Sequence, residues 1–161
     1  MTPVFETPED RANEERAARR YCDSRGLLLQ MRPQFSPFDF FGYEPGNPNI
    51  VVAGEVKCRN VRSGGYGGYA YFDREKAEVL RAVGLELGCD AVAVLEYTDG
   101  LFCVDADTIL KCRTTKAKRH DRGDHDRLQD ACLIPLAKLQ RIRTKQVERR
   151  TRIIPELESG N

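Results

Sequence analysis

A carboxylate and an ammonium group stand two residues apart at the end of an apolar run, and this pair constrains the fold most. Residues 50–53 read Ile-Val-Val-Ala, a run typical of a strand buried on both faces. Glu55 and Lys57 follow almost directly, and burying either charge alone would be costly. Because side chains alternate along a strand, we expect Glu55 and Lys57 on one face and Val56 on the other. The sequence therefore predicts a polar cluster inside an apolar sheet.

A second carboxylate lies in a shorter apolar segment upstream. Asp39 stands between Phe38 and Phe40, which we expect to face away from it. Two carboxylates and a lysine on strands that can pair would supply oxygen ligands for a divalent cation and a positive group beside a reacting phosphate. The alternative is an ordinary Glu–Lys pair on a solvent-facing strand edge.

The pattern resembles the PD-(D/E)XK nuclease superfamily, and more closely its branch related to Holliday-junction resolvases. That branch opens with a helix reading E-x-x-A-x-x-Y, which Glu15, Ala18 and Tyr21 match. Its metal strand reads V-E-V-K-x-R, against G-E-V-K-C-R at 54–59 here. The branch's Gly-Glu-Ile-Asp strand is replaced by Ser-Pro-Phe-Asp at 36–39, which keeps the aspartate. The resemblance covers roughly residues 8–104, and a phage or mobile-element origin would suit it.

The resemblance implies a metal-dependent DNA endonuclease or exonuclease with the restriction-endonuclease-like αβββαβ core, a central mixed sheet flanked by helices. It implies Mg²⁺, with Mn²⁺ as a substitute, held by Asp39, Glu55, the Val56 carbonyl and Glu15. Lys57 would orient the attacking water or stabilise developing charge. Helix periodicity alone leaves Glu14 and Glu15 both open, and the resemblance selects Glu15. The alternative function is a nucleic-acid-binding module that keeps the fold without catalysis.

Local signals predict the same order of elements. Thr7 and Pro8 are typical of a helix start, Asp73 of an N-cap, and Gly88 of a helix end. Apolar runs and the Asp-Gly turn at 99–100 predict the strands. The sequence therefore predicts a helix to about residue 25, strands over 27–31, 36–41 and 49–58, a helix over 73–88, and strands over 90–97 and 101–104.

A glycine-rich segment, 63–71, joins the third expected strand to the second expected helix. It lacks the Gly-Lys-Ser/Thr of a P-loop, which disfavours nucleoside triphosphates. Tyr66 or Tyr69 could stack on an unpaired base, and the alternative is that both tyrosines simply pack. Basic residues around the segment could contact phosphates, namely Arg59, Arg62, Arg74 and Lys76, the last being also the helix lysine that the resemblance expects.

Charge divides the chain unevenly. Residues 1–110 hold 12 lysines and arginines against 18 aspartates and glutamates, whereas residues 111–152 hold 14 against 5. We therefore predict a nuclease core over 1–107 and a basic extension over 108–161, of which 131–142 packs on the core and the rest is loop or tail. A basic extension suits an enzyme that acts on a polyanion such as DNA. The alternative is a solvated tail without a partner.

The remaining features concern location and assembly. No apolar run is long enough to span a membrane, and the first residues lack a signal-peptide pattern. Six scattered cysteines favour reduced thiols in the cytoplasm, that of the host if a phage encodes the chain. Two cysteines and two histidines between 112 and 132 match no zinc-finger spacing. DNA is the expected partner, and a homodimer is an open alternative to a monomer.

Overall fold

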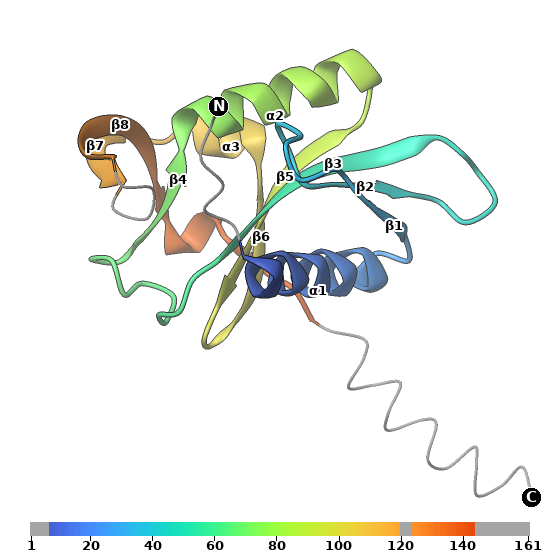
Figure 1. Cartoon of the computed structure of the whole chain (residues 1–161), viewed down its shortest axis with the longest axis horizontal. Helices are drawn as coiled ribbons and strands as arrows, with labels where there is room; N and C mark the ends of the chain where they lie inside the picture. Colours follow the sequence, from blue (N-terminus) through green and yellow to red (C-terminus); the bar gives the residue numbers. More distant parts are fainter. Residues whose placement is uncertain (1–6, 120–123, 144–161) are drawn as a thin grey trace, which may run out of the picture.

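A mixed six-stranded sheet forms the centre of the molecule in the computed structural model, which describes residues 7–119 and 124–143 (Figure 1). Its strand order is β1-β2-β3-β5-β6-β9, and β3 and β5 run parallel while the other neighbours are antiparallel. The strands are β1 (Leu28–Met31), β2 (Phe40–Tyr43), β3 (Ile50–Cys58), β5 (Asp90–Tyr97), β6 (Gly100–Asp105) and β9 (Gln140–Arg141).

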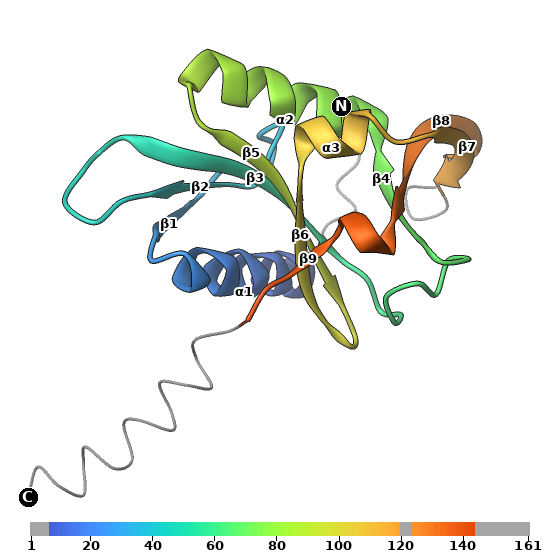
Figure 2. The same ribbon diagram turned by 180° about the vertical axis from the view of Figure 1, so that it is seen from behind.

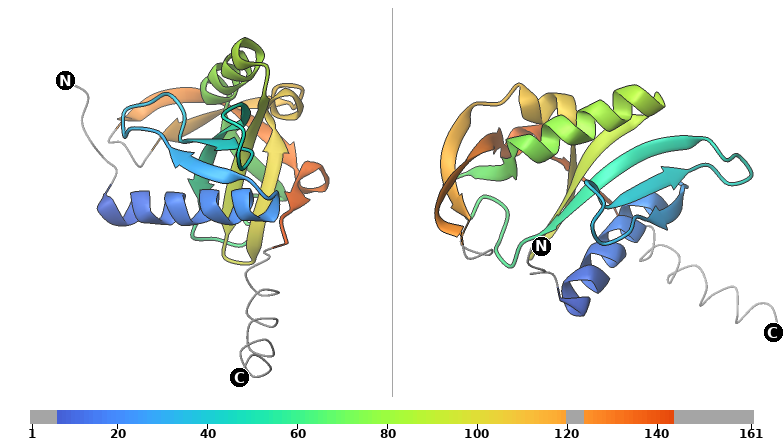
Figure 3. Two further views of the ribbon diagram at one scale, coloured as in Figure 1. Left: turned by 90° about the vertical axis from the view of Figure 1, so that its right-hand side faces the viewer. Right: turned by 45° about the horizontal axis from the view of Figure 1, so that its top comes forward.

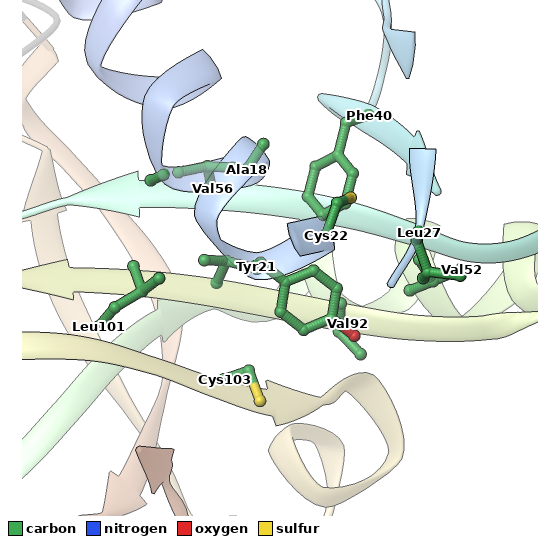
Figure 4. Close-up of a cluster of buried hydrophobic side chains, with 12 residues drawn as sticks. Ala18, Tyr21, Cys22, Leu27, Phe40, Val52, Val56, Val92, Leu101 and Cys103 are labelled. Atoms are coloured by element: carbon green, nitrogen blue, oxygen red, sulfur yellow. The ribbon is translucent and has the colours of Figure 1, made fainter. Parts of the chain in front are cut away.

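Helix α1 (Pro8–Ser24) covers one face of this sheet. Thr7 forms the expected N-cap, as a capping box with Asp10. The buried side of α1 packs Tyr21 against the edge of the Phe40 ring, at 6.0 Å between centroids, and onto the apolar residues of β3, β5 and β6. Figure 4 shows this cluster between the helix and the strands. From Val52 onward, even-numbered residues of β3, such as Val56, therefore face α1.

Helix α2 (Arg74–Leu87) covers the opposite face. Asp73 caps it by accepting hydrogen bonds from the backbone N–H groups of Glu75 and Lys76, at 2.9 and 3.4 Å, and Gly88 ends it in the left-handed conformation. Leu80 packs with Ala53 of β3 in the cluster beneath the helix. From Ala53 onward, odd-numbered residues of β3 therefore face α2, and the first turn of α2 lies above this strand.

A second, three-stranded sheet adjoins the first and was not predicted. Its order is β4-β8-β7, from β4 (Tyr69–Asp73), β7 (Thr114–Arg119) and β8 (Asp124–Pro135). The glycine-rich segment thus ends in a strand, because Tyr69 to Asp73 pair with Pro135 to Ala131 of β8. β8 is the central strand of this sheet, and Pro135, which has no N–H to donate to a ladder, is its last residue.

Residues beyond 107 contribute to the core rather than forming a mainly irregular extension. The expected boundary after Asp107 falls inside helix α3 (Ala106–Leu110), and the short η1 (Leu136–Lys138) leads into β9 at the sheet edge (Figure 2). Cys132 and Ile134 of β8 are fully buried beside Leu95 of β5. Packing of 131–142 on the body is as expected, whereas 108–119 and 124–130 are more regular than expected, because they lie largely in α3, β7 and β8. Residues 144–161 lie outside the described part.

The second strand begins later than expected. It starts at Phe40, so Asp39 immediately precedes it, and the strand continues to Tyr43. Pro37 has no N–H to donate to a ladder, and pairing with β3 starts at Phe40 opposite Gly54. The expectation that Phe38 and Phe40 share one side was wrong, because Phe38 packs beneath α2 and Phe40 beneath α1.

Within residues 7–119 and 124–143, no helix has both the length and the apolar character needed to cross a bilayer.

Candidate metal and nuclease site

Strand β3 places one carboxylate and one ammonium group beneath α2. Glu55 is 2% exposed, and it is the buried charged side chain among the described residues. The Lys57 side chain is 23% exposed, and its Nζ lies 3.7 Å from Oε1 of Glu55. Val56, between them, is buried on the α1 side. The expected alternation of the three residues is therefore confirmed, and the alternative of a solvent-facing Glu–Lys pair does not fit the burial of Glu55.

Asp39 reaches the same strand from the end of β2. Its backbone N–H donates to the Gly54 carbonyl at 3.0 Å, and its Oδ2 accepts a hydrogen bond from the Val56 N–H at 2.7 Å. Pairing of β2 with β3 begins only at Phe40, so the Val56 N–H lies beyond the ladder, where the Asp39 carboxylate accepts it. The N–H and C=O of a strand residue point the same way, so the Val56 carbonyl is directed toward Asp39 as well.

Close approach of β2 to β3 depends on Gly54. A side chain at this position would collide with the ring of Phe40, which lies directly over the glycine. The absence of a Cβ thus lets Phe40 fill the α1 side of the sheet while Asp39, its neighbour, hydrogen-bonds β3.

Lys76 completes the cluster from the first turn of α2. Its Nζ lies 2.8 Å from Oε1 of Glu55, closer than the Lys57 ammonium. Two positive groups therefore compensate the buried Glu55 charge, which would otherwise be costly. The sequence placed Lys76 among phosphate contacts, but its side chain is engaged with Glu55.

The environment shifts the pKa of two members. Burial, and then the Glu55 charge, raise the pKa of Asp39 to about 6, against the lowering effect of the Val56 hydrogen bond and of Lys57 and Lys76. Burial lowers the pKa of Lys57, and the Lys76 ammonium lowers it further, whereas Glu55 and Asp39 oppose the shift. Burial is the larger cause of both pKa shifts, and the neighbouring charges modify them.

Glu15 does not join this cluster. It is exposed on α1, whereas Glu14 is half-buried on the side of Ala17, Ala18 and Tyr21. Glu14 also raises the pKa of the Cys58 thiol, so it lies toward the end of β3. Across the described residues, no three His, Cys, Asp or Glu side chains gather closely enough to hold a metal ion. Helix α1 therefore adds no third carboxylate to Asp39 and Glu55 in this conformation.

The expected DNA-contacting residues surround the glycine-rich segment. Tyr66 and Tyr69 face each other across Gly67 and Gly68, both at positive φ, in a two-residue hairpin turn. Tyr66 is 41% exposed, and the edge of its ring meets Tyr71. The remaining members are less available: Tyr69 is half-buried beneath the Arg113 guanidinium, Arg74 pairs with Glu78 at 3.0 Å, Arg59 is half-buried, and Arg62 is exposed.

The cluster fits a hard divalent cation. Asp39 and Glu55 offer carboxylate oxygens, the Val56 carbonyl points to the same side, and no softer nitrogen or sulfur ligand takes part among the described residues. Magnesium ions are commonly held by one or two carboxylates, with water and substrate phosphate filling the other positions. The sequence already disfavoured a zinc site at the two cysteines and two histidines between 112 and 132. His120 lies outside the described residues, as does the side chain of His125.

A family model described as "Phage putative PDDEXK endonuclease" matches residues 1–142 of the chain. The chain belongs to this family of phage PD-(D/E)XK endonucleases. The expected superfamily is thereby confirmed, and the protein is a DNA endonuclease whose chemistry depends on a divalent metal ion. The match spans the two sheets described above, so β7, β8 and β9 are part of the family's unit rather than an appendage.

One solved structure shows the same fold at low sequence identity. The Holliday junction resolvase Hjc of Archaeoglobus fulgidus superposes with a TM-score of 0.51 at 12% identity, covering 79% of this chain and 85% of the resolvase. D212, a nuclease from a fusellovirus, gives a TM-score of 0.47 at 14% identity, covering 86% and 90%. No curated protein matches the sequence. The expected restriction-endonuclease-like α/β architecture is confirmed.

Proposed function

We propose that the endonuclease uses Asp39, Glu55 and the Val56 carbonyl to hold Mg²⁺, for which Mn²⁺ can substitute, and that Lys57 acts on the reacting phosphate. The observation that carries this proposal is the convergence on one face of β3: the Asp39 carboxylate fixed on the Val56 N–H at 2.7 Å, beside a buried Glu55. When bound there, the ion would lower the pKa of a water molecule and offset phosphate charge.

The protein's own groups divide the work. Asp39 is held in place by its backbone and side-chain hydrogen bonds to β3, so little reorganisation is needed when it binds a ligand. Lys57 stands on the same face as Glu55 and is partly exposed, so its ammonium can orient the attacking water or stabilise the developing negative charge. Lys76 holds Glu55 in position from α2.

Residues on the surface around the metal site are the candidates for contacts with the DNA substrate. We propose that Arg59, Arg62 and Arg74 contact phosphates and that Tyr66, whose ring meets Tyr71, stacks on a base, while Tyr69 offers a second, less exposed ring. The Lys76 ammonium pairs with Glu55, and it can reach a phosphate only when a metal ion takes its place beside the Glu55 carboxylate. For the helix carboxylate, burial favours Glu14 over Glu15, and Glu14→Gln and Glu15→Gln test the two side by side.

Cleavage assays test the assignment. Four-way junction, flapped duplex, linear duplex and single-stranded DNA are incubated with Mg²⁺ or Mn²⁺, and we expect at least one to be cut. Glu55→Gln should abolish cutting, while Glu78→Gln, which changes an exposed glutamate of α2, should not. Tight DNA binding without cutting of any substrate would favour a binding module.

Metal binding is measured separately from cutting. The unfolding midpoint should rise with Mg²⁺ or Mn²⁺, because a ligand of the folded state stabilises it by mass action. Asp39→Asn should remove most of this rise while the protein stays folded. An equal rise in the variant would place the metal at other residues.

A further inference from the structure

Phe35 is an exposed aromatic side chain on the connection that leads into the site. It is 75% exposed, and burial of its ring would ordinarily be favourable. Of the six large apolar side chains that are exposed in the described residues, four are aliphatic, and the two aromatic ones are Phe35 and Tyr66. Phe35 lies four residues before Asp39, and Tyr66 lies beyond Lys57 on the connection between β3 and β4. Both exposed rings therefore stand on segments that adjoin the nuclease site.

The segment that carries Phe35 is braced. The Ser36 N–H donates to the Pro33 carbonyl at 2.9 Å, which closes a turn with Phe35 at its third position. The Arg32 N–H donates to the Asp39 carbonyl at 2.8 Å, so the two ends of the connection are tied together. Prolines at 33 and 37 restrict the backbone further. The exposed ring is thus presented from an ordered turn, which reduces the entropy lost on binding.

Positive charge lies at the base of this turn. The Arg32 guanidinium stands over the rings of Phe38 and Phe41, at 5.4 and 5.0 Å, and Arg11 of α1 donates to the Arg32 carbonyl at 2.5 Å. Arg32 also donates to the Ser36 hydroxyl at 3.3 Å. The connection between β1 and β2 extends outward from the sheet in the left view of Figure 3. An exposed aromatic ring with a guanidinium on the same connection is a combination that can bind a base and its phosphate.

We propose that Phe35 stacks on an unpaired base close to the phosphate that is cut, and that the substrate class is DNA with unpaired bases beside a duplex. This inference rests on the proposed function of Asp39. Four extended residues span at most about 14 Å, so the ring stays within a few nucleotides of the site. In an intact duplex both faces of each base are covered by neighbours, so only unpaired bases offer a face to the ring.

Binding without metal separates this proposal from catalysis. The full chain is titrated in EDTA into a fluorescent flapped duplex and into a fully paired duplex of the same length. Phe35→Ala should weaken binding to the flapped duplex by about tenfold and change binding to the paired duplex by less than about twofold. Phe35→Tyr should restore tight binding, because stacking needs a ring. Leu85→Ala, at an equally exposed site on α2, should leave both affinities unchanged.

Three outcomes would overturn the proposal: unchanged binding to the flapped duplex, equal weakening on both duplexes, or a changed sedimentation coefficient that places Phe35 between two copies of the chain. The rise of the unfolding midpoint with Mg²⁺ should be the same in Phe35→Ala as in the wild type. Loss of that rise in the wild type itself would overturn the metal site instead, and the binding comparison would still report on Phe35.

Discussion

The Lys76 ammonium lies 2.8 Å from Oε1 of Glu55, so the first turn of α2 supplies the nearest positive charge to the buried carboxylate of β3. This contact ties the helix to the site strand across the sheet face on which the metal is proposed to bind. The Lys76 ammonium compensates the buried charge of Glu55, and a metal ion bound by Glu55 would compensate the same charge. Stability and metal binding are therefore coupled through this pair.

Replacing Lys76 should therefore destabilise the metal-free protein. In Lys76→Met, Glu55 keeps only the more distant Lys57, and the free energy of unfolding should fall by about 1–3 kcal/mol, since both lysines are partly exposed. Urea unfolding in EDTA measures the loss, and Mg²⁺ should recover more stability in the variant than in the wild type. Arg74→Met, which removes an exposed pair on the same helix, should cost less than about 1 kcal/mol.

The raised pKa of Asp39 predicts a pH dependence in the metal-free protein. The folded state holds the Asp39 proton up to about pH 6, whereas the unfolded chain releases it near 3.8, so the folded state binds more protons between these values. Stability should therefore fall as pH rises through this window, by roughly 3 kcal/mol from Asp39 alone. Asp39→Asn keeps an oxygen for the Val56 N–H and should lack this fall. Parallel curves for the two proteins would contradict the shift.

Loss of Lys57 should impair chemistry more than metal binding. Lys57→Met should lower the cleavage rate by about 100-fold or more at saturating metal, because a positive group aimed at developing charge is lost. The Mg²⁺-induced rise in unfolding midpoint should persist, since the lysine is no metal ligand. Lys116→Met removes a lysine that pairs with Asp130 on the second sheet, and it should leave the rate nearly unchanged. A normal rate in Lys57→Met would remove this residue from the mechanism.

Gly54→Ala should destabilise the sheet because the new methyl group would meet the Phe40 ring. We expect a loss of about 1–3 kcal/mol in chemical denaturation, as overpacking displaces Phe40 and with it Asp39. The double variant Phe40→Leu, Gly54→Ala should lose less than the sum of the two single variants, because the smaller side chain makes room. Additive losses would mean that Phe40 is not the obstacle.

Truncation distinguishes the two ends of the basic region. A chain ending at Asp107 lacks β8, whose Cys132 and Ile134 are fully buried, and we expect it to lose its cooperative unfolding transition. A chain ending at Arg143 keeps all described elements and should unfold at the wild-type midpoint. Circular dichroism melts compare the two. A cooperative transition in the shorter chain would show that 1–107 is a separate domain.

Much of the site followed from local sequence. The apolar run before Glu55 and Lys57 predicted a buried strand with both charges on one face, and that alternation is what the structure has. Helix caps at Thr7, Asp73 and Gly88 were predicted because capping depends on neighbouring residues. Helix periodicity allowed either Glu14 or Glu15 on the buried side of α1, and sequence alone could not choose between them.

Other features depended on distant partners. Residues 69–73 gave no clear strand signal beside their glycines, because their pairing partner, β8, lies about sixty residues further on. The sequence did not indicate a functional role for Phe35, since a phenylalanine between two prolines is ordinarily expected to pack in the core. Only the tertiary structure showed that its ring stays exposed while Phe38 and Phe41 beside it are buried.

By itself the sequence determined the fold class, the site strand and the placing of Glu55 and Lys57 on one face of that strand, because the period of two along a strand and the order of elements are local features of the sequence. Tertiary structure decided which groups meet across elements. It placed the Lys76 ammonium on Glu55, the Asp39 carboxylate on the Val56 N–H, and strands β4, β7 and β8 in a second sheet. These contacts join residues 17 to 66 positions apart, and no local pattern specifies which distant group will satisfy a buried charge or an unpaired backbone N–H.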